Sequence, residues 1–119
     1  MFGKDNELFF YLSSYETCIL LRMNGGGMNL LVLPNALKHG LSKEEVEYAW
    51  RSPLRCRQRQ SKDEPPRWIA IGILPDGRVV ELVAFEDVNG AWVIFHANTP
   101  PTDKFLKELG IKGGRHGRN

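Results

Sequence analysis

Short apolar segments along the chain are separated by polar turns, and each segment predicts a short strand or helix. Residues 29–33 are mostly apolar, and Pro34 follows them directly, which predicts a short strand at this point. Residues 35–39 then predict a short helical turn. Gly40 is expected to end that turn, because glycine readily adopts the backbone conformation found just after a helix.

A second helix is expected to begin after Ser42. Ser42 and Glu45 have the spacing of a capping box, in which each side chain accepts a hydrogen bond from a free backbone N–H group at the start of the helix. Val46, Ala49 and Trp50 then fall on one face at helical spacing. This segment is predicted to be an amphipathic helix with that face in the core.

The rest of the chain predicts a β-meander followed by a last helix. Asn89-Gly90 is a strong hairpin signal, and Pro75-Asp76-Gly77 indicates another tight turn, so the neighbouring strands are expected to run antiparallel. In the last helix, Phe105, Leu106 and Leu109 are expected to point inward. The strands are predicted at 54–60, 68–74, 78–86 and 92–97, and the helix at 102–109.

These elements predict an α+β fold in the order β-α-α-β-β-β-β-α. A twisted antiparallel sheet would be packed by two front helices and a C-terminal helix. Residues 28–110 are expected to form this domain, and 111–119 a flexible basic tail. Residues 1–27 would be an N-terminal extension, and translation starting at Met28 is an equally open alternative.

Composition fits one ordinary globular domain. The chain has 119 residues, of which 42% are hydrophobic and 25% charged, with a net charge of +2. This charge does not identify a nucleic-acid-binding protein, so any such function must rest on where the cations lie.

The two cysteines, Cys18 and Cys56, belong to no CxxC pair, so neither a disulfide framework nor a cysteine zinc site is expected, and a reducing cytoplasm is favoured. The longest apolar run is far below the ~20 residues of a membrane helix.

Three arginines form the first candidate site. Arg55, Arg57 and Arg59 would lie on one face of a strand, because side chains alternate along it, and their guanidinium groups would suit phosphates. Arg67 opens the next strand and could join them. The alternative is a solvated face beside the acidic loop that follows, and the two interpretations carry about equal weight.

Two histidines are further candidates. His39 follows Lys38 at the end of a short helix and could donate or accept a proton near neutral pH. By residue type alone, a surface histidine favoured by the helix dipole is the commoner explanation. His96 is expected to share a strand face with Trp92 and Ile94, where a core role is again commoner.

No metal or cofactor site is predicted. His39, His96 and His116 lack the spacing of metal ligands, and no GxxxxGK loop occurs. Asn98 and Thr99 could donate hydrogen bonds to a phosphate or cap the last helix.

Four short motifs resemble those of the BrnT-like toxins of the RelE-like superfamily, and they follow one another in the family's order. The resemblance covers 28–110. The motifs are Asn35 to Ser42 with Glu44-Glu45-Val46, Arg67 to Gly72, Asp76-Gly77-Arg78 with Val79-Val80, and Ile94 to Ala97.

The resemblance implies a RelE-like fold and a cytoplasmic, metal-independent endoribonuclease that cleaves mRNA. It also implies a type II toxin–antitoxin system, with a DNA-binding antitoxin encoded nearby. Carried over by position, His39 would be the general acid or base. Lys38, Arg67 and then Arg55 would stabilise the phosphate while the RNA 2′-hydroxyl attacks it.

The chain departs from the family pattern after the last strand. Members often carry an Ala-Arg step and further arginines there, whereas this chain has His96-Ala97, and Lys104 is the nearest cation. His96 is the expected substitute. The alternatives are a non-catalytic RelE-like module that binds a partner protein, and a sequence-independent RNA-binding protein.

Overall fold

The computed structural model describes residues 29–111 and shows an α+β fold. The expected order of elements is confirmed within this range, although the first helical turn is a 3-10 helix, η1. The predicted extension at 1–27 and most of the predicted tail lie outside the described residues. The elements are β1 (Leu30–Val32), η1 (Pro34–Leu37), α3 (Lys43–Arg51), β2 (Pro53–Gln58), β3 (Trp68–Ile73), β4 (Val79–Glu86), β5 (Trp92–Asn98) and α4 (Asp103–Glu108).

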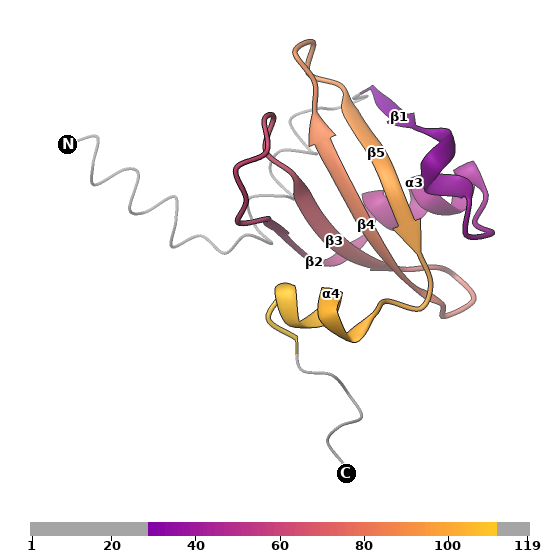
Figure 1. The fold of residues 1–119 in the computed structure, drawn as a ribbon. Coiled ribbons are helices and arrows are strands. Elements are labelled where there is room, and N and C mark those ends of the chain that lie inside the picture. Colours follow the sequence, from indigo (N-terminus) through magenta and orange to yellow (C-terminus); the bar gives the residue numbers. More distant parts are fainter. Residues whose placement is uncertain (1–28, 112–119) are drawn as a thin grey trace.

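The five strands form one mixed sheet in the order β1-β5-β4-β3-β2 (Figure 1). Strands β2 to β5 are an antiparallel meander, as predicted. Strand β1, however, pairs parallel to β5, with Leu30 opposite Trp92, so the prediction of a wholly antiparallel sheet is wrong. No hairpin fixes the direction of β1. After β1 the chain passes through η1 and α3 to β2, which lies at the opposite edge of the sheet. Strands β1 and β5 are therefore far apart in the sequence, as the two strands of a parallel pair must be.

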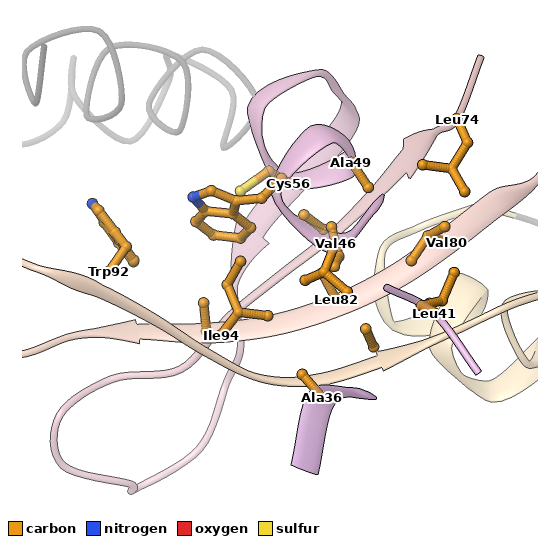
Figure 2. Packing of buried hydrophobic residues seen from close by; sticks show 14 residues of the cluster. Ala36, Leu41, Val46, Ala49, Cys56, Leu74, Val80, Leu82, Trp92 and Ile94 are labelled. Carbon is orange, nitrogen blue, oxygen red and sulfur yellow. The ribbon is translucent and has the colours of Figure 1, made fainter. Parts of the chain in front are cut away.

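Helix α3 and η1 cover one face of the sheet. The buried face of α3 consists of Val46, Ala49 and Trp50, as predicted. These residues pack on side chains of the sheet such as Leu82 (Figure 2), and the rings of Trp50 and Trp92 lie 5.5 Å apart. The helix lies so close to β3 that a Cβ atom at Gly72 would be 2.3 Å from the Ala49 carbonyl oxygen.

Helix α4 packs against the other face. Phe105 and Leu109 are buried there in a second cluster with Ile69, Ile71 and Val83, which confirms the expected inward face of the last helix. At the start of the helix, the Phe105 backbone N–H donates to the Thr102 hydroxyl at 3.1 Å. The sheet is therefore covered by helices on both faces, which are called the α3 side and the α4 side. A pocket with polar side chains lies on the α4 side.

A β-bulge in β5 changes the face on which His96 lies. Val83 of β4 pairs with His96 but Ala84 pairs with Ile94, so Phe95 is an extra residue in β5. Ile94 remains in the α3-side core, whereas His96 and Phe95 both turn to the α4 side. The expectation that His96 shares a face with Ile94 is therefore wrong, because one inserted residue interrupts the alternation.

Cys56 is fully buried on β2 within the α3-side core. Its sulfur takes part in a disulfide bond, so the expectation that the cysteines are reduced is wrong for this residue. Distance along the sequence is a poor guide here, since disulfide formation depends on separation in space. The second cysteine, Cys18, lies outside the described residues.

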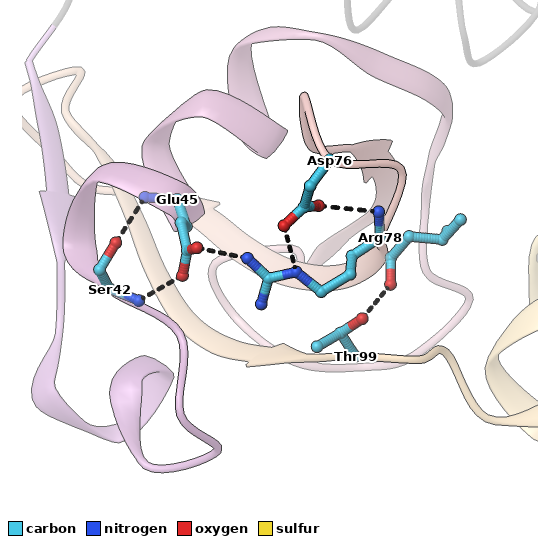
Figure 3. Close-up of polar contacts among 6 residues, drawn as sticks. Ser42, Glu45, Asp76, Arg78 and Thr99 are labelled. Atoms are coloured by element: carbon cyan, nitrogen blue, oxygen red, sulfur yellow. Dashed lines mark hydrogen bonds and ion pairs between the residues drawn. The ribbon is translucent and has the colours of Figure 1, made fainter.

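Polar contacts attach the β3–β4 turn to the start of α3 (Figure 3). The predicted capping box is confirmed: the Glu45 N–H donates to Ser42 Oγ at 3.0 Å, and the Ser42 N–H donates to Glu45 Oε1 at 2.9 Å. Arg78 donates to the second oxygen of Glu45 and, through Nε, to Asp76 Oδ2 at 2.8 Å. Two carboxylates thus share one guanidinium group.

This network is expected to make stability depend on pH. The Ser42 N–H, and then Arg78, lower the pKa of Glu45 below its ordinary 4.5, and the Arg78 N–H lowers the pKa of Asp76 below its ordinary 3.8. Both carboxyls therefore ionise more readily in the folded chain. Their stabilisation is present above these ordinary values and is lost as the pH falls through the lowered ones.

The measurement is the melting temperature of wild type and Arg78→Met between pH 7 and pH 3. The variant is expected to melt lower at pH 7, and the gap is expected to narrow toward pH 3. A gap that stays constant over this range would show that the ion pairs to Arg78 add no stability.

Candidate functional site

A pocket of about 340 Å³ lies between α4 and β5 on the α4 side of the sheet. It is mostly lined by polar and charged side chains, with Val83, Phe95 and Phe105 as its apolar wall. A mixed lining of this kind suits a small polar group and not a purely apolar ligand. The polar lining includes Asn35, Arg59, Glu81, His96, Lys104 and Glu108.

Glu81 and His96 form a hydrogen-bonded pair at this pocket. Among residues 29–111, Glu81 is the one charged residue that is buried, with 4% of its surface exposed. Its Oε2 lies 2.7 Å from His96 Nε2, and its Oε1 accepts the Thr102 backbone N–H at 2.9 Å. Both carboxylate oxygens therefore have partners, as a buried charge requires.

This pairing determines how His96 can react. A carboxylate accepts hydrogen bonds, so Nε2 of His96 carries a hydrogen and donates it to Glu81. In the neutral ring, Nδ1 is then the proton acceptor. Within the described part of the chain Nδ1 makes no hydrogen bond, and 29% of the side chain is exposed. His96 thus offers a fixed, accessible base to the pocket.

His39 lies beside His96. The two ring centroids are 6.0 Å apart and the rings are nearly perpendicular, at 71°. The turn that carries His39 is held against β5, because Asn35 Nδ2 donates to the Phe95 carbonyl at 2.9 Å. The structure therefore brings together two histidines that are 57 positions apart in the sequence. Lys38 is exposed on the same turn, and in the described range it has no ion pair.

Arg55 and Arg57 of β2, and Arg59 directly after it, share one face on the α4 side, as predicted. Two of them hold the end of α4: Arg57 Nη1 donates to the Glu108 carbonyl at 3.2 Å, and Arg59 forms a two-pronged contact with the Glu108 carboxylate, at 2.5 and 3.1 Å. A cation at the C-terminal end of a helix also complements its dipole. Arg55 is exposed and, in the range described, forms no ion pair.

Arg67 lies on two aromatic rings. Its guanidinium carbon is 5.0 Å from the centre of the Phe85 ring and 5.3 Å from that of Phe95, and Nη1 donates to the Pro65 carbonyl at 2.8 Å. No carboxylate of the described residues pairs with Arg67, and the same is true of Lys104 in the pocket wall. These two cations remain available to an anionic ligand.

Glu81 is a site residue that the sequence analysis missed. The signal was present, since Glu81 is the single charged residue in the apolar run Val79 to Phe85. A carboxylate in the middle of a buried strand needs partners and often marks a functional site.

No group of three potential metal ligands occurs among residues 29–111. In the same range, no helix combines the length and hydropathy that crossing a membrane would require. The pocket is lined by His96 and Lys104, whereas His39 and Arg67 lie just outside its lining, against His96 and Phe95. Two histidines close to two cations are a combination suited to proton transfer on an anionic ligand such as a phosphodiester.

Comparison of the chain with family models, with curated proteins and with solved structures finds no match.

Proposed function

We propose that this chain is a metal-independent endoribonuclease with a RelE/BrnT-like fold, acting as the toxin of a type II toxin–antitoxin system. The observation that carries the proposal is the Glu81–His96 pair beside His39 at a polar pocket. The ordered motifs that resemble BrnT-like toxins add the substrate class. The resemblance supplies a cytoplasmic location, mRNA as substrate and a DNA-binding antitoxin encoded nearby. The disulfide at Cys56 removes the cysteine-based argument for that location, which therefore rests on the resemblance.

The pocket supports cleavage by the RNA's own 2′-hydroxyl. Nδ1 of His96 accepts the 2′-hydroxyl proton, and the oxygen attacks the adjacent phosphorus. The bond to the 5′-oxygen breaks, and protonated His39 donates a proton to that oxygen. The products are a 2′,3′-cyclic phosphate and a 5′-hydroxyl end. A ring separation of 6.0 Å allows one phosphodiester to contact both histidines.

Cations stabilise the charge that gathers on the phosphate oxygens. Lys104 lines the pocket, and Arg67 adjoins it through Phe95. Neither is neutralised by a carboxylate of the described residues, so both can contact the phosphate in the crowded transition state. Arg57 and Arg59 contribute indirectly, by holding α4 and therefore Lys104 in place.

Purified protein incubated with single-stranded RNA tests the proposal. Cleavage that leaves 5′-hydroxyl ends is expected, with the same rate in EDTA, because the histidines replace a metal ion. Induced expression is expected to arrest growth, and co-expression of the neighbouring gene to restore it. Loss of cleavage in EDTA would contradict the metal-free mechanism.

The second candidate is a non-catalytic module of the same fold that binds a protein partner or RNA. One observation favours it: Arg57 and Arg59, two of the cations predicted to bind phosphate, are engaged by Glu108. Absence of both RNA cleavage and growth arrest would support this candidate over the nuclease.

A further inference from the structure

A cluster of Arg67, Phe85 and Phe95 lies next to the histidine pocket and has no role in the proton transfers. The two phenyl rings have centroids 5.8 Å apart and are tilted by 41°, and the Arg67 guanidinium lies over both. All three residues are only partly buried, so the cluster is at the surface.

The strand pairing explains why the cluster adjoins His96. Phe85 belongs to β4, Phe95 is the bulge residue of β5, and Arg67 lies directly before the neighbouring strand β3, so the three residues come from adjacent positions across the sheet. The bulge places Phe95 beside His96 on the α4 side, and Phe95 also lines the pocket. The cluster and the histidine site therefore form one continuous surface.

The orientation of Arg67 is fixed by its partners. The hydrogen bond to the Pro65 carbonyl uses one N–H of Nη1, and the rings hold the guanidinium plane. In the described part of the chain, no carboxylate neutralises this cation. A planar cation held on aromatic rings without a counter-ion is a surface on which nucleobases stack.

We propose that Arg67, Phe85 and Phe95 form a subsite that stacks the nucleobase of a nucleotide flanking the cleaved phosphodiester. The inference rests on the proposed ribonuclease function and specifies its substrate: single-stranded RNA, since a paired base is not free to leave its stack. Stacking tolerates any base, because every base has a π face. The subsite therefore positions the RNA without selecting a sequence.

Binding of a 2′-O-methylated RNA pentamer tests the subsite. Methylation blocks the attacking hydroxyl, so affinity is measured without cleavage. A matched pentamer carries an abasic site in place of one base, placed in turn at each position. At one position the wild type is expected to bind the abasic pentamer about tenfold more weakly, the usual effect of one stacked base.

Two variants connect this loss to the cluster. Arg67→Lys keeps the charge but removes the planar group, and Phe85→Leu removes a ring but keeps an apolar side chain. In each variant, the affinities for the intact and the abasic pentamer are expected to become similar, so that their ratio falls from ten toward one. Lys104→Met is the matched control: it removes a cation from the pocket and is expected to weaken both pentamers equally, leaving the ratio unchanged.

The outcomes separate the two proposals. Equal binding of intact and abasic pentamers by a wild type that cleaves RNA would overturn the subsite and leave the ribonuclease standing. A tenfold ratio that persists in folded Arg67→Lys and Phe85→Leu would place the stacked base elsewhere and also overturn the subsite. Failure to bind any pentamer, together with failure to cleave, would overturn both.

Discussion

Replacing His96 with alanine is expected to lower kcat for RNA cleavage by about 10³-fold, the effect of removing a general base. The Nδ1 atom that accepts the 2′-hydroxyl proton is lost, and in the described residues no other base is hydrogen-bonded to a buried carboxylate as His96 is to Glu81. Initial rates on a fluorogenic RNA measure the change, and circular dichroism confirms that the variant is folded.

Lys43→Ala is the matched control for this variant. Lys43 is an exposed residue of α3, on the opposite face of the sheet, so its removal is expected to leave kcat unchanged. If a folded His96→Ala protein cleaves RNA at the same rate as the wild type, the general base lies elsewhere.

Replacing Trp50 with alanine is expected to lower the free energy of unfolding by about 4 kcal/mol, the usual cost of truncating a buried aromatic side chain. Trp50 is 1% exposed and packs against Trp92 at the centre of the α3-side core. Its removal leaves a cavity between α3 and the sheet. Denaturation by urea, with a two-state fit, measures the loss.

Tyr48→Ala makes the same kind of truncation on the same helix. Tyr48 is 46% exposed, so the free energy of unfolding is expected to change by about 0.5 kcal/mol or less. Equal losses for Tyr48→Ala and Trp50→Ala would contradict the placement of α3 with Trp50 inward and Tyr48 outward.

Features of the fold that depend on neighbouring residues could be predicted from the sequence. The capping box of Ser42 and Glu45 and the turn at Asn89-Gly90 need only a few residues, and both occur as expected. The direction of β1 could not be predicted in this way, since it depends on a strand about 60 positions away. The bulge at Phe95 also escaped prediction, because an extra residue leaves no mark in an apolar strand.

The site was predictable in its residue types more than in its arrangement. His39 and His96 were candidates, yet nothing in the sequence shows that their rings come within 6.0 Å. The stripe of arginines was expected, but its engagement by Glu108, about 50 residues later, depends on where α4 packs. Long-range packing therefore decides which cations are left for a ligand.

The bulge in β5 lets two consecutive residues, Phe95 and His96, point to the same face of the sheet. Deleting Phe95 would restore strict alternation, and His96, then directly after Ile94, would stay on the α4 side. The deletion would remove the ring that connects the pocket to Arg67. In evolutionary terms, the gain of one codon could therefore add an aromatic surface next to this histidine without moving the histidine itself.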